Sequence, residues 1–360
     1  MNRREFLQTT AVATVGAAAI PGLSLSAAEP KPPSAAKLPR WRGFNLLEKF
    51  VKQRNGNPPF REEDFALLAE WGFDFARLPM SYLCWADATD WLTLREEELN
   101  HIDTAVELGR KHSVHVNLNL HRAPGYCVNP PKEPSDLWKD EKALDACAFH
   151  WAHFAKRYQG VANERLSFDL LNEPGDIPEE TYARVVKRLV AAIRAEDPHR
   201  LIIADGLRWG RDPVHSLAGL GIAQSTRGYD PMEISHYKAS WIHGSDKWPE
   251  PTWPLKRAGK ETADRDTLRK DRIAPWQALE RKGVGIHVGE WGAFNKTPHP
   301  VSLAWMRDCL ELWREAGWGW SLWNLRGGFG VLDSARADVE YEDFRGHKLD
   351  REMLKVLQAG

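Results

Sequence analysis

Two glutamates follow apolar runs of the sequence, at positions where β-strands are expected to end. Glu173 closes the run Leu-Leu-Asn-Glu ahead of Pro174, and Glu290 closes Val-Gly-Glu ahead of Trp291. A single carboxylate at a strand end usually caps a helix or lies on the surface. Two carboxyl groups that face each other can instead flank a glycosidic bond, where one protonates the leaving oxygen and the other attacks the anomeric carbon or activates water. This chemistry needs a fold that brings the two glutamates together.

The chain from Trp41 onward alternates short β-like segments with longer helical segments, and eight of each are predicted. Strict βα alternation implies parallel strands with right-handed crossovers, and eight units favour a closed barrel over an open sheet. No GxGxxG or GxxxxGK[ST] motif follows the first strand, so the phosphate-binding signature of common open sheets is missing. The predicted strands are Trp41–Leu47, Phe73–Pro79, Val114–His121, Leu166–Glu173, Leu201–Asp205, Glu233–Tyr237, Val284–Glu290 and Trp318–Leu325.

The helical segments show apolar residues at 3.6-residue spacing. One stripe consists of Tyr182, Val185, Val186, Leu189, Val190 and Ile193. The segment around Val214–Leu220 is the shortest of the eight. We therefore predict an α/β fold, a single (β/α)₈ TIM barrel over residues 41–360.

Barrel enzymes build their sites at the C-terminal ends of the strands. The predicted strands place six chemically versatile residues there: Arg77, His121, Glu173, His236, Glu290 and Trp323. In the segment Val114–His121 apolar and polar residues alternate strictly. Helices would cover the apolar face of this strand, so its polar face is expected to point into the barrel, with His121 at the rim.

The N-terminus has the pattern of an export signal. Arg3 and Arg4 precede a mildly apolar stretch over residues 9–20, and Ser26-Ala27-Ala28 offers small residues for a signal peptidase. The apolar stretch is too short for an ordinary transmembrane helix. We predict a twin-arginine-type signal peptide over residues 1–28, a linker over 29–40, a periplasmic or secreted protein, and no membrane attachment after cleavage.

Composition narrows the classes of partner. Lysine and arginine number 49 against 50 aspartates and glutamates, so nothing favours a nucleic-acid partner. The four cysteines match no zinc or CxxC spacing and could pair or stay free: Cys84, Cys127, Cys147 and Cys309. There are 13 histidines but no HxH or HExxH motif, so a metal-dependent hydrolase is a weaker alternative. We expect no metal, no cofactor and a monomer.

The order of motifs resembles glycoside hydrolase family 5, one of the clan A barrels. The similarity extends over the whole predicted mature chain and rests on these segments: Arg42-Gly43-Phe44-Asn45-Leu46, Arg77-Leu78-Pro79, Leu120-His121 with Ala123-Pro124-Gly125, Leu171-Asn172-Glu173-Pro174, Gly289-Glu290-Trp291-Gly292 and Trp323-Asn324. The resemblance implies a retaining β-glycanase, with carboxyl groups about 5 to 5.5 Å apart. A carbohydrate-binding barrel without catalysis remains an alternative.

The resemblance also implies roles for individual residues. Glu173 would be the general acid/base and Glu290 the nucleophile, with Arg77 beside it to hold it ionised. Asn172 would bind the 2-hydroxyl of the sugar at the cleaved bond. His121 and His236 would contact sugar hydroxyls or the carboxylates, and Trp323 would form the floor of the −1 subsite.

Strand six departs from the expected pattern. The family usually offers His-x-Tyr there, whereas the predicted strand reads Ser235-His236-Tyr237-Lys238. Either a bulge restores Tyr237 as a substrate-binding residue, or Lys238 replaces it. The expected substrate is a β-linked polysaccharide or oligosaccharide, with β-1,4-glucan first and β-mannan or β-1,3-glucan, the latter cleaved by exo action, as alternatives.

Overall fold

Eight parallel β-strands form a closed barrel in the computed structural model, which describes residues 32–52, 56–257, 259 and 261–360. Each strand pairs with the next around the barrel, and the pairing of the second strand with the third completes the circle. The barrel prediction is therefore confirmed. The strands are β1 (Arg42–Asn45), β2 (Phe75–Ser81), β3 (His115–Ala123), β5 (Leu166–Asp169), β6 (Ile202–Asp205), β7 (Ala223–Gly228), β8 (Ile286–Trp291) and β9 (Gly319–Leu322).

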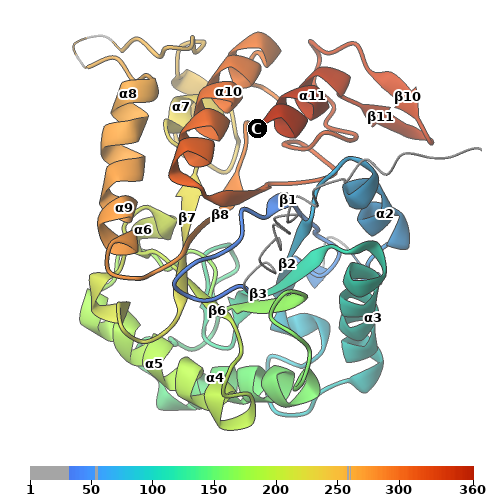
Figure 1. Cartoon of the computed structure of the whole chain (residues 1–360), viewed down its shortest axis with the longest axis vertical. Helices are drawn as coiled ribbons and strands as arrows, with labels where there is room; N and C mark the ends of the chain where they lie inside the picture. Colours follow the sequence, from blue (N-terminus) through green and yellow to red (C-terminus); the bar gives the residue numbers. More distant parts are fainter. Residues whose placement is uncertain (1–31, 53–55, 258, 260) are drawn as a thin grey trace, which may run out of the picture. The chain divides into compact units, whose positions relative to one another are not determined.

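Helices surround the strands as an outer ring (Figure 1). They bury their apolar stripes against the strands, and all six residues of the stripe predicted from Tyr182 to Ile193 are buried. The longer helices are α2 (Glu62–Glu70), α3 (Glu96–His112), α4 (Glu141–Arg157), α5 (Glu179–Glu196), α10 (His299–Ala316) and α11 (Arg351–Ala359). Between β7 and β8, α8 (Arg265–Leu268) and α9 (Ala274–Glu280) are joined by a π-helical turn over Arg269–Ile273.

Shorter elements complete the described chain. Between β6 and β7 lie α6 (Leu207–Gly210) and a 3₁₀ turn, η2 (His215–Leu217), where the shortest helix was predicted. The short strand β4 (Tyr126–Cys127) folds back antiparallel on β3. A hairpin of β10 (Glu342–Phe344) and β11 (His347–Leu349) precedes α11, and α7 (Met232–Ser235) follows β7. The remaining 3₁₀ turns are η1 (Tyr82–Cys84) and η3 (Ser245–Lys247).

Strand β3 directs its polar face into the barrel and its apolar face toward the helices. His115 Nε2 and Asn117 Nδ2 both contact the Ser167 hydroxyl inside the barrel, at 2.7 and 2.9 Å. The alternate residues Val116, Leu118 and Leu120 belong to the large apolar core that the helices share. The inward orientation predicted for the polar face is thus confirmed.

The predicted sixth strand is wrong. Residues 232–235 form helix α7, and His236 and Tyr237 follow it, whereas the strand is β7, ten residues earlier. Strand β7 has the sequence Ala-Gln-Ser-Thr-Arg-Gly, without apolar alternation. Its polar side chains are buried and hydrogen-bonded inside the molecule; Gln224, for example, bonds the backbone of Val214 in both directions. A strand stabilised by buried polar side chains shows no alternation of apolar and polar residues, so its sequence does not predict it.

Residues 34–41 cover the N-terminal end of the barrel. The amide of Gly285 donates to the carbonyl of Ala35 at 2.7 Å. Leu38 and Trp41 pack in an apolar cluster inside this end, together with Phe75, Leu201, Ile203 and Ala223. The described part of the predicted linker over 29–40 thus packs against the barrel, with Leu38 buried. The signal peptide predicted over 1–28 lies outside the described residues.

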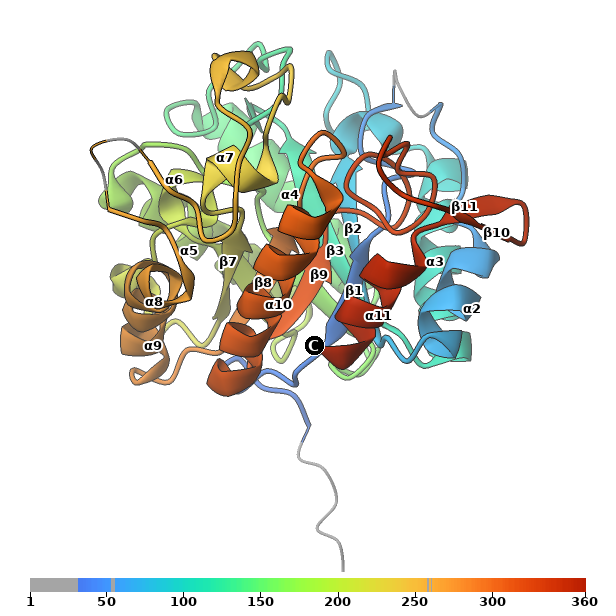
Figure 2. The same ribbon diagram turned by 90° about the horizontal axis from the view of Figure 1, so that it is seen from above.

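All four cysteines carry free thiols in this structure, so of the two alternatives, paired or free, the structure has the free form. Among the described residues, no helix is both long enough and apolar enough to cross a membrane. Figure 2 shows the barrel from the side, with α7 at the end where the strands finish and the C-terminus toward the opposite end.

Candidate active site

Glu173 and Glu290 meet at one guanidinium group. Glu290 lies on β8, and Glu173 follows β5 by four residues. Arg227, near the end of β7, donates from Nε to Glu173 Oε1 at 2.9 Å and from Nη2 to Glu290 Oε1 at 3.5 Å. Two glutamates far apart in the sequence are therefore neighbours at the C-terminal end of the barrel.

Glu290 accepts hydrogen bonds on both carboxylate oxygens. Arg77 Nη1 donates to Oε1 at 2.6 Å, and the Tyr229 hydroxyl donates to Oε2 at 3.2 Å. His121 Nδ1 lies 4.0 Å from Oε1. Burial and the charges of Glu290 and Glu173 raise the pKa of Tyr229 well above its usual range, so the phenol remains a donor. Two cations and a phenol thus compensate negative charge on Glu290.

Glu173 has a different environment. Its φ of 50° is left-handed, a conformation held by a bond from its own amide to Asp205 Oδ2 at 2.8 Å. Its backbone carbonyl accepts from the Tyr126 hydroxyl at 2.7 Å. Burial, and next the charge of Glu290, raise the pKa of Glu173 to about 8, although Arg227 opposes the shift. This environment therefore favours the protonated form of Glu173.

Arg77 and Asn172 connect the two glutamates to the barrel interior. Arg77 donates to Asp169 Oδ2 at 2.8 Å, to Asn45 Oδ1 at 3.0 Å and to Asn172 Oδ1 at 2.9 Å. Asn172 Oδ1 also accepts from Arg227 Nη2 at 2.9 Å, so the amide orientation is fixed by two cations. Burial and then the neighbouring Asp205 raise the pKa of Asp169 to about 7.

His121 and Trp323 form an aromatic wall beside Glu290. Their rings stack with centroids 5.5 Å apart, and Phe50 packs edge-on against both, at 4.6 and 5.2 Å. Burial, and then the charge of Arg77, hold the pKa of His121 well below its usual range, so the imidazole is neutral. His121 Nε2 also lies 3.1 Å from Asn172 Nδ2.

His236 and Tyr237 lie elsewhere than predicted. His236 caps the C-terminus of α7, and its ring contacts the Tyr229 ring at 5.0 Å, so it borders the site through that tyrosine. Burial lowers the pKa of His236 to about 4. Tyr237 is buried beneath Lys238, whose Nζ lies 4.9 Å from the ring centroid. Tyr229, rather than Tyr237 or Lys238, contacts Glu290.

Sequence reasoning missed four residues of the cluster: Asp169, Asp205, Arg227 and Tyr229. Asp205 ends a predicted strand, so its position was a usable signal. Arg227 and Tyr229 are two residues apart, which places them on one face of an extended chain, as expected of His-x-Tyr. Arg227 pairs in register with Glu290 after a bulge between Thr226 and Arg227. An arginine therefore stands where the resemblance predicts a histidine.

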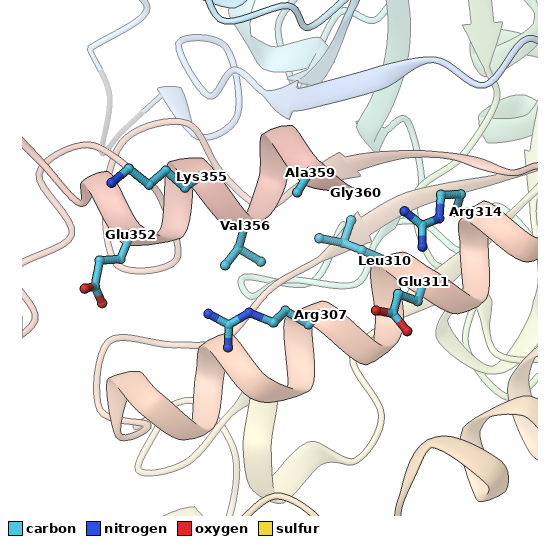
Figure 3. Close-up of a pocket in the computed structure, with 9 residues that line it drawn as sticks. All are labelled: Arg307, Leu310, Glu311, Arg314, Glu352, Lys355, Val356, Ala359 and Gly360. Carbon is cyan, nitrogen blue, oxygen red and sulfur yellow. The ribbon is translucent and has the colours of Figure 1, made fainter.

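No group of three or more His, Cys, Asp or Glu side chains among the described residues is placed to hold a metal ion. A groove of about 480 Å³ lies between α10 and α11, on the outside of the barrel (Figure 3). Its lining mixes charged side chains such as Arg307, Arg314 and Glu352 with the apolar Leu310 and Val356. The groove is formed by outer helices and is separate from the strand ends that carry the glutamates.

Comparison with known proteins agrees with this geometry. The sequence profile described as "Cellulase (glycosyl hydrolase family 5)" matches residues 34–328. Endoglucanase C of Acetivibrio thermocellus is 26% identical over 305 residues, which cover 78% of this chain and 88% of that protein.

Two solved structures have the same fold. A crystal structure described as a glycoside hydrolase has a TM-score of 0.84 and 41% identity, covering 89% of this chain and 99% of its own. Endoglucanase Cel5A from Thermotoga maritima has a TM-score of 0.73 at 21% identity, covering 88% and 96% of the two chains. Because the family profile spans most of the sequence, the chain belongs to glycosyl hydrolase family 5.

Proposed function

We propose that this glycoside hydrolase cleaves β-linked glucans with retention of configuration, and that its main activity is that of an endo-β-1,4-glucanase. The observation that carries the proposal is the meeting of Glu173 and Glu290 at the Arg227 guanidinium, in unlike environments. Glu173 has a raised pKa and carries a proton, whereas Glu290 accepts three hydrogen bonds and offers a carboxylate. Environments that separate two carboxyl groups in this way assign one as the acid and the other as the nucleophile.

The reaction proceeds in two steps. In the first, Glu290 attacks the anomeric carbon, the glycosidic C–O bond breaks, and the Glu173 proton passes to the leaving oxygen. In the second, Glu173 takes a proton from water, the water oxygen attacks the anomeric carbon, and the ester bond to Glu290 breaks. Both side chains then return to their starting states. The His121–Trp323 wall provides a face for the sugar that carries the reacting carbon.

Trp209 is placed to bind the sugar on the leaving-group side. The residue is 47% exposed, and its amide donates to the Pro174 carbonyl at 2.9 Å, next to Glu173. Arg208 and Trp209 both have left-handed φ angles, of 49° and 61°. Non-glycine residues in this conformation are strained and persist where the surrounding structure holds them. A strained backbone that presents an indole to solvent beside the acid suits a ring-stacking platform.

Trp241 offers a second exposed indole, 56% accessible, on the segment that follows β7. It packs edge-on against Phe294, with centroids 4.8 Å apart, and tilts against Phe329 at 6.2 Å. Phe329 also contacts the Tyr229 ring at 6.3 Å. This aromatic row runs from the nucleophile's hydrogen-bond donor outward to solvent, which suits binding of an extended chain.

Azide rescue tests the two catalytic roles. With an activated aryl β-glycoside, azide is expected to restore turnover of Glu290→Gly and to give a glycosyl azide of inverted configuration. With Glu173→Ala it should react with the glycosyl-enzyme and give the retained product. Rescue with the configurations exchanged, or a mechanism-based fluorosugar that labels another residue, would refute the assignment.

A panel of β-1,4-glucan, β-mannan and β-1,3-glucan tests the substrate. Internal cleavage of β-1,4-glucan should be fastest, and it would be followed by chain-length analysis of the products. Release of glucose alone from β-1,3-glucan would favour the exo-acting alternative, to which the segment Arg326-Gly327-Gly328-Phe329-Gly330 also points.

We further propose that the chain is exported by the twin-arginine route, is processed near Glu29, and works as a monomer in the periplasm or outside the cell. The support is the sequence pattern around Arg3 and Arg4. Replacing both arginines with lysine should retain the protein in the cytoplasm. N-terminal sequencing of exported protein and its mass in solution would check the cleavage site and the oligomeric state.

A further inference from the structure

Arg227 has a full set of hydrogen-bond acceptors and a buried side chain, 2% exposed. Nε donates to Glu173, and the two terminal nitrogens form a bidentate pair with Asp205. The terminal nitrogens also reach Asn172 Oδ1 at 2.9 Å and the Ser225 hydroxyl at 3.1 Å. Its orientation is therefore fixed independently of Glu173.

The buried cluster contains two cations and four carboxyl groups. Arg77 and Arg227 face the carboxyl groups of Asp169, Asp205, Glu173 and Glu290. Two positive charges against four negative ones would leave a net charge of −2, and the raised pKa values of Glu173 and Asp169, about 8 and about 7, favour proton uptake that reduces it. In a site removed from water, the position of each remaining charge matters.

The proposed first step moves a negative charge between the two glutamates. Glu290 loses its charge as the ester forms, and Glu173 gains one as its proton leaves. Arg77 is bonded to Glu290, and its other hydrogen-bond partners are Asn45, Asp169 and Asn172. Arg227 contacts both glutamates, at 2.9 Å on Glu173 and 3.5 Å on Glu290. Arg227 therefore contacts the glutamate that is negatively charged before the step, Glu290, and the one that is negatively charged after it, Glu173.

Arg227 also determines which oxygen of Glu173 holds the proton. An arginine Nε–H is always a donor and cannot accept. Because this group points at Glu173 Oε1 at 2.9 Å, that oxygen must act as the acceptor. The proton of the neutral acid then resides on Oε2, the oxygen that Arg227 does not occupy.

We infer that Arg227 is a positioning residue that fixes the reactive proton on Glu173 Oε2 and stabilises the Glu173 carboxylate while Glu290 is glycosylated. The inference rests on the proposed roles of the two glutamates. It predicts that loss of the Arg227 cation raises the pKa of Glu173, so that Glu173 stays protonated to higher pH. The second step, which needs the carboxylate at neutral pH, should then become the slower one.

The test compares Arg227→Gln with Arg227→Lys on two substrates, a cello-oligosaccharide whose poor leaving group needs the Glu173 proton and an activated dinitrophenyl β-cellobioside. For Arg227→Gln on the cello-oligosaccharide, the alkaline limb of kcat/KM should move up by about one pH unit or more, since an opposite charge at contact distance lowers a carboxyl pKa by about 1 to 3 units. On the dinitrophenyl β-cellobioside at pH 7, kcat and KM should fall together, and a pre-steady-state burst of dinitrophenol should show that glycosyl-enzyme accumulates. Arg227→Lys keeps a cation and should keep the alkaline limb close to that of the wild type.

Two further variants separate electrostatics from folding. Asp205→Asn combined with Arg227→Gln removes one charge of each sign, so its limb should return part of the way toward the wild type. Arg257→Gln breaks a partly exposed pair with Glu233, outside the cluster, and should leave the pH profile unchanged. If Arg227→Gln does not fold, the Lys and double variants carry the same test.

The inference would be overturned if folded Arg227→Gln showed neither a shift in the alkaline limb of the kcat/KM profile nor a burst. It would also be overturned if Arg227→Lys shifted that limb as far as Arg227→Gln does. Labelling of Glu290 by a fluorosugar in the wild type separates this failure from failure of the proposed function. With Glu290 labelled and the limb unshifted, the glutamate roles stand and only the role of Arg227 falls.

Discussion

The interior of the barrel is apolar at one end and charged at the other. At the N-terminal end, Leu38, Trp41 and Phe75 pack with three aliphatic residues, and the His115 ring contacts the rings of both Trp41 and Phe75. At the C-terminal end, the interior holds two arginines among carboxyl groups, with aromatic rings at the margin. The same eight strands pass through both regions.

The difference shows how the fold separates stability from chemistry. Apolar burial at the N-terminal end stabilises the barrel without directional constraints. Burial of charge at the C-terminal end is costly unless every group is paired, and buried ion pairs are weak evidence for stability. The paired charges are therefore better understood as preorganised groups for the reaction than as a source of folding energy.

The largest expected effect is at the charged end. Glu290→Gln keeps the shape and the hydrogen-bonding oxygen of the side chain but removes the nucleophile. Activity should fall on the order of 10⁶-fold, as on removal of another catalytic nucleophile. The thermal unfolding midpoint should change little, because the variant lowers the net negative charge of the cluster. Steady-state kinetics and circular dichroism would check both, and a collapse in thermal stability would show that this end is also structural.

The loss of activity in Glu173→Ala should depend on the leaving group of the substrate, as expected if Glu173 is the general acid. Substrates with poor leaving groups need protonation, so their kcat/KM should fall about 10²- to 10⁴-fold. Dinitrophenyl glycosides need no proton and should retain their kcat/KM. A uniform loss across a series of aryl glycosides would contradict the role of Glu173.

Phe75→Ala probes the apolar end. Phe75 is fully buried and stacks on His115 at 5.4 Å, with His287 at 4.5 Å. Truncation should cost about 3 to 5 kcal/mol in the free energy of unfolding, as for other buried phenylalanines. The kcat/KM of the folded protein should stay near that of the wild type. Leu92→Ala, at a side chain 58% exposed, is the control that should change neither quantity.

The two ends should also respond to pH in opposite directions. Burial lowers the pKa of His115 and of His287 to about 3, so the stability from their neutral forms is present above about 6.5 and is lost as pH falls toward 3. Burial raises the pKa of Glu173 to about 8 and of Asp169 to about 7. The stability that comes from the protonated forms of these two groups is fully present below about pH 4 and is lost as pH rises to 8.

Urea unfolding at several pH values tests this contrast. Between pH 6.5 and 8, stability should fall as pH rises, and Glu173→Gln should flatten that slope. Between pH 3 and 4.5, stability should fall as pH falls, and the same variant should follow the wild type. If Glu173→Gln altered only the acid branch, the assignment of the two branches would be reversed.

The smallest expected effect is at the exposed margin. Trp209→Ala should raise KM about tenfold for cello-oligosaccharides that extend into the leaving-group side, which corresponds to about 1.4 kcal/mol. Aryl glycosides with a small leaving group should show little change in KM. An equal rise for both kinds of substrate would place Trp209 outside the leaving-group side.

The sequence by itself determined the barrel, the seven strands with a hydrophobic period, the helical stripes and the two glutamates after strands four and seven. These features are local, because periodicity and strand ends are written in consecutive residues. Only the tertiary structure located the sixth strand, placed Arg227, Asp205 and Tyr229 in the site, and joined residues 34–40 to the barrel. Strand β7 is held by polar bonds to distant residues, and a carboxylate's partners depend on which strands close the barrel. Neither fact leaves a pattern along the chain.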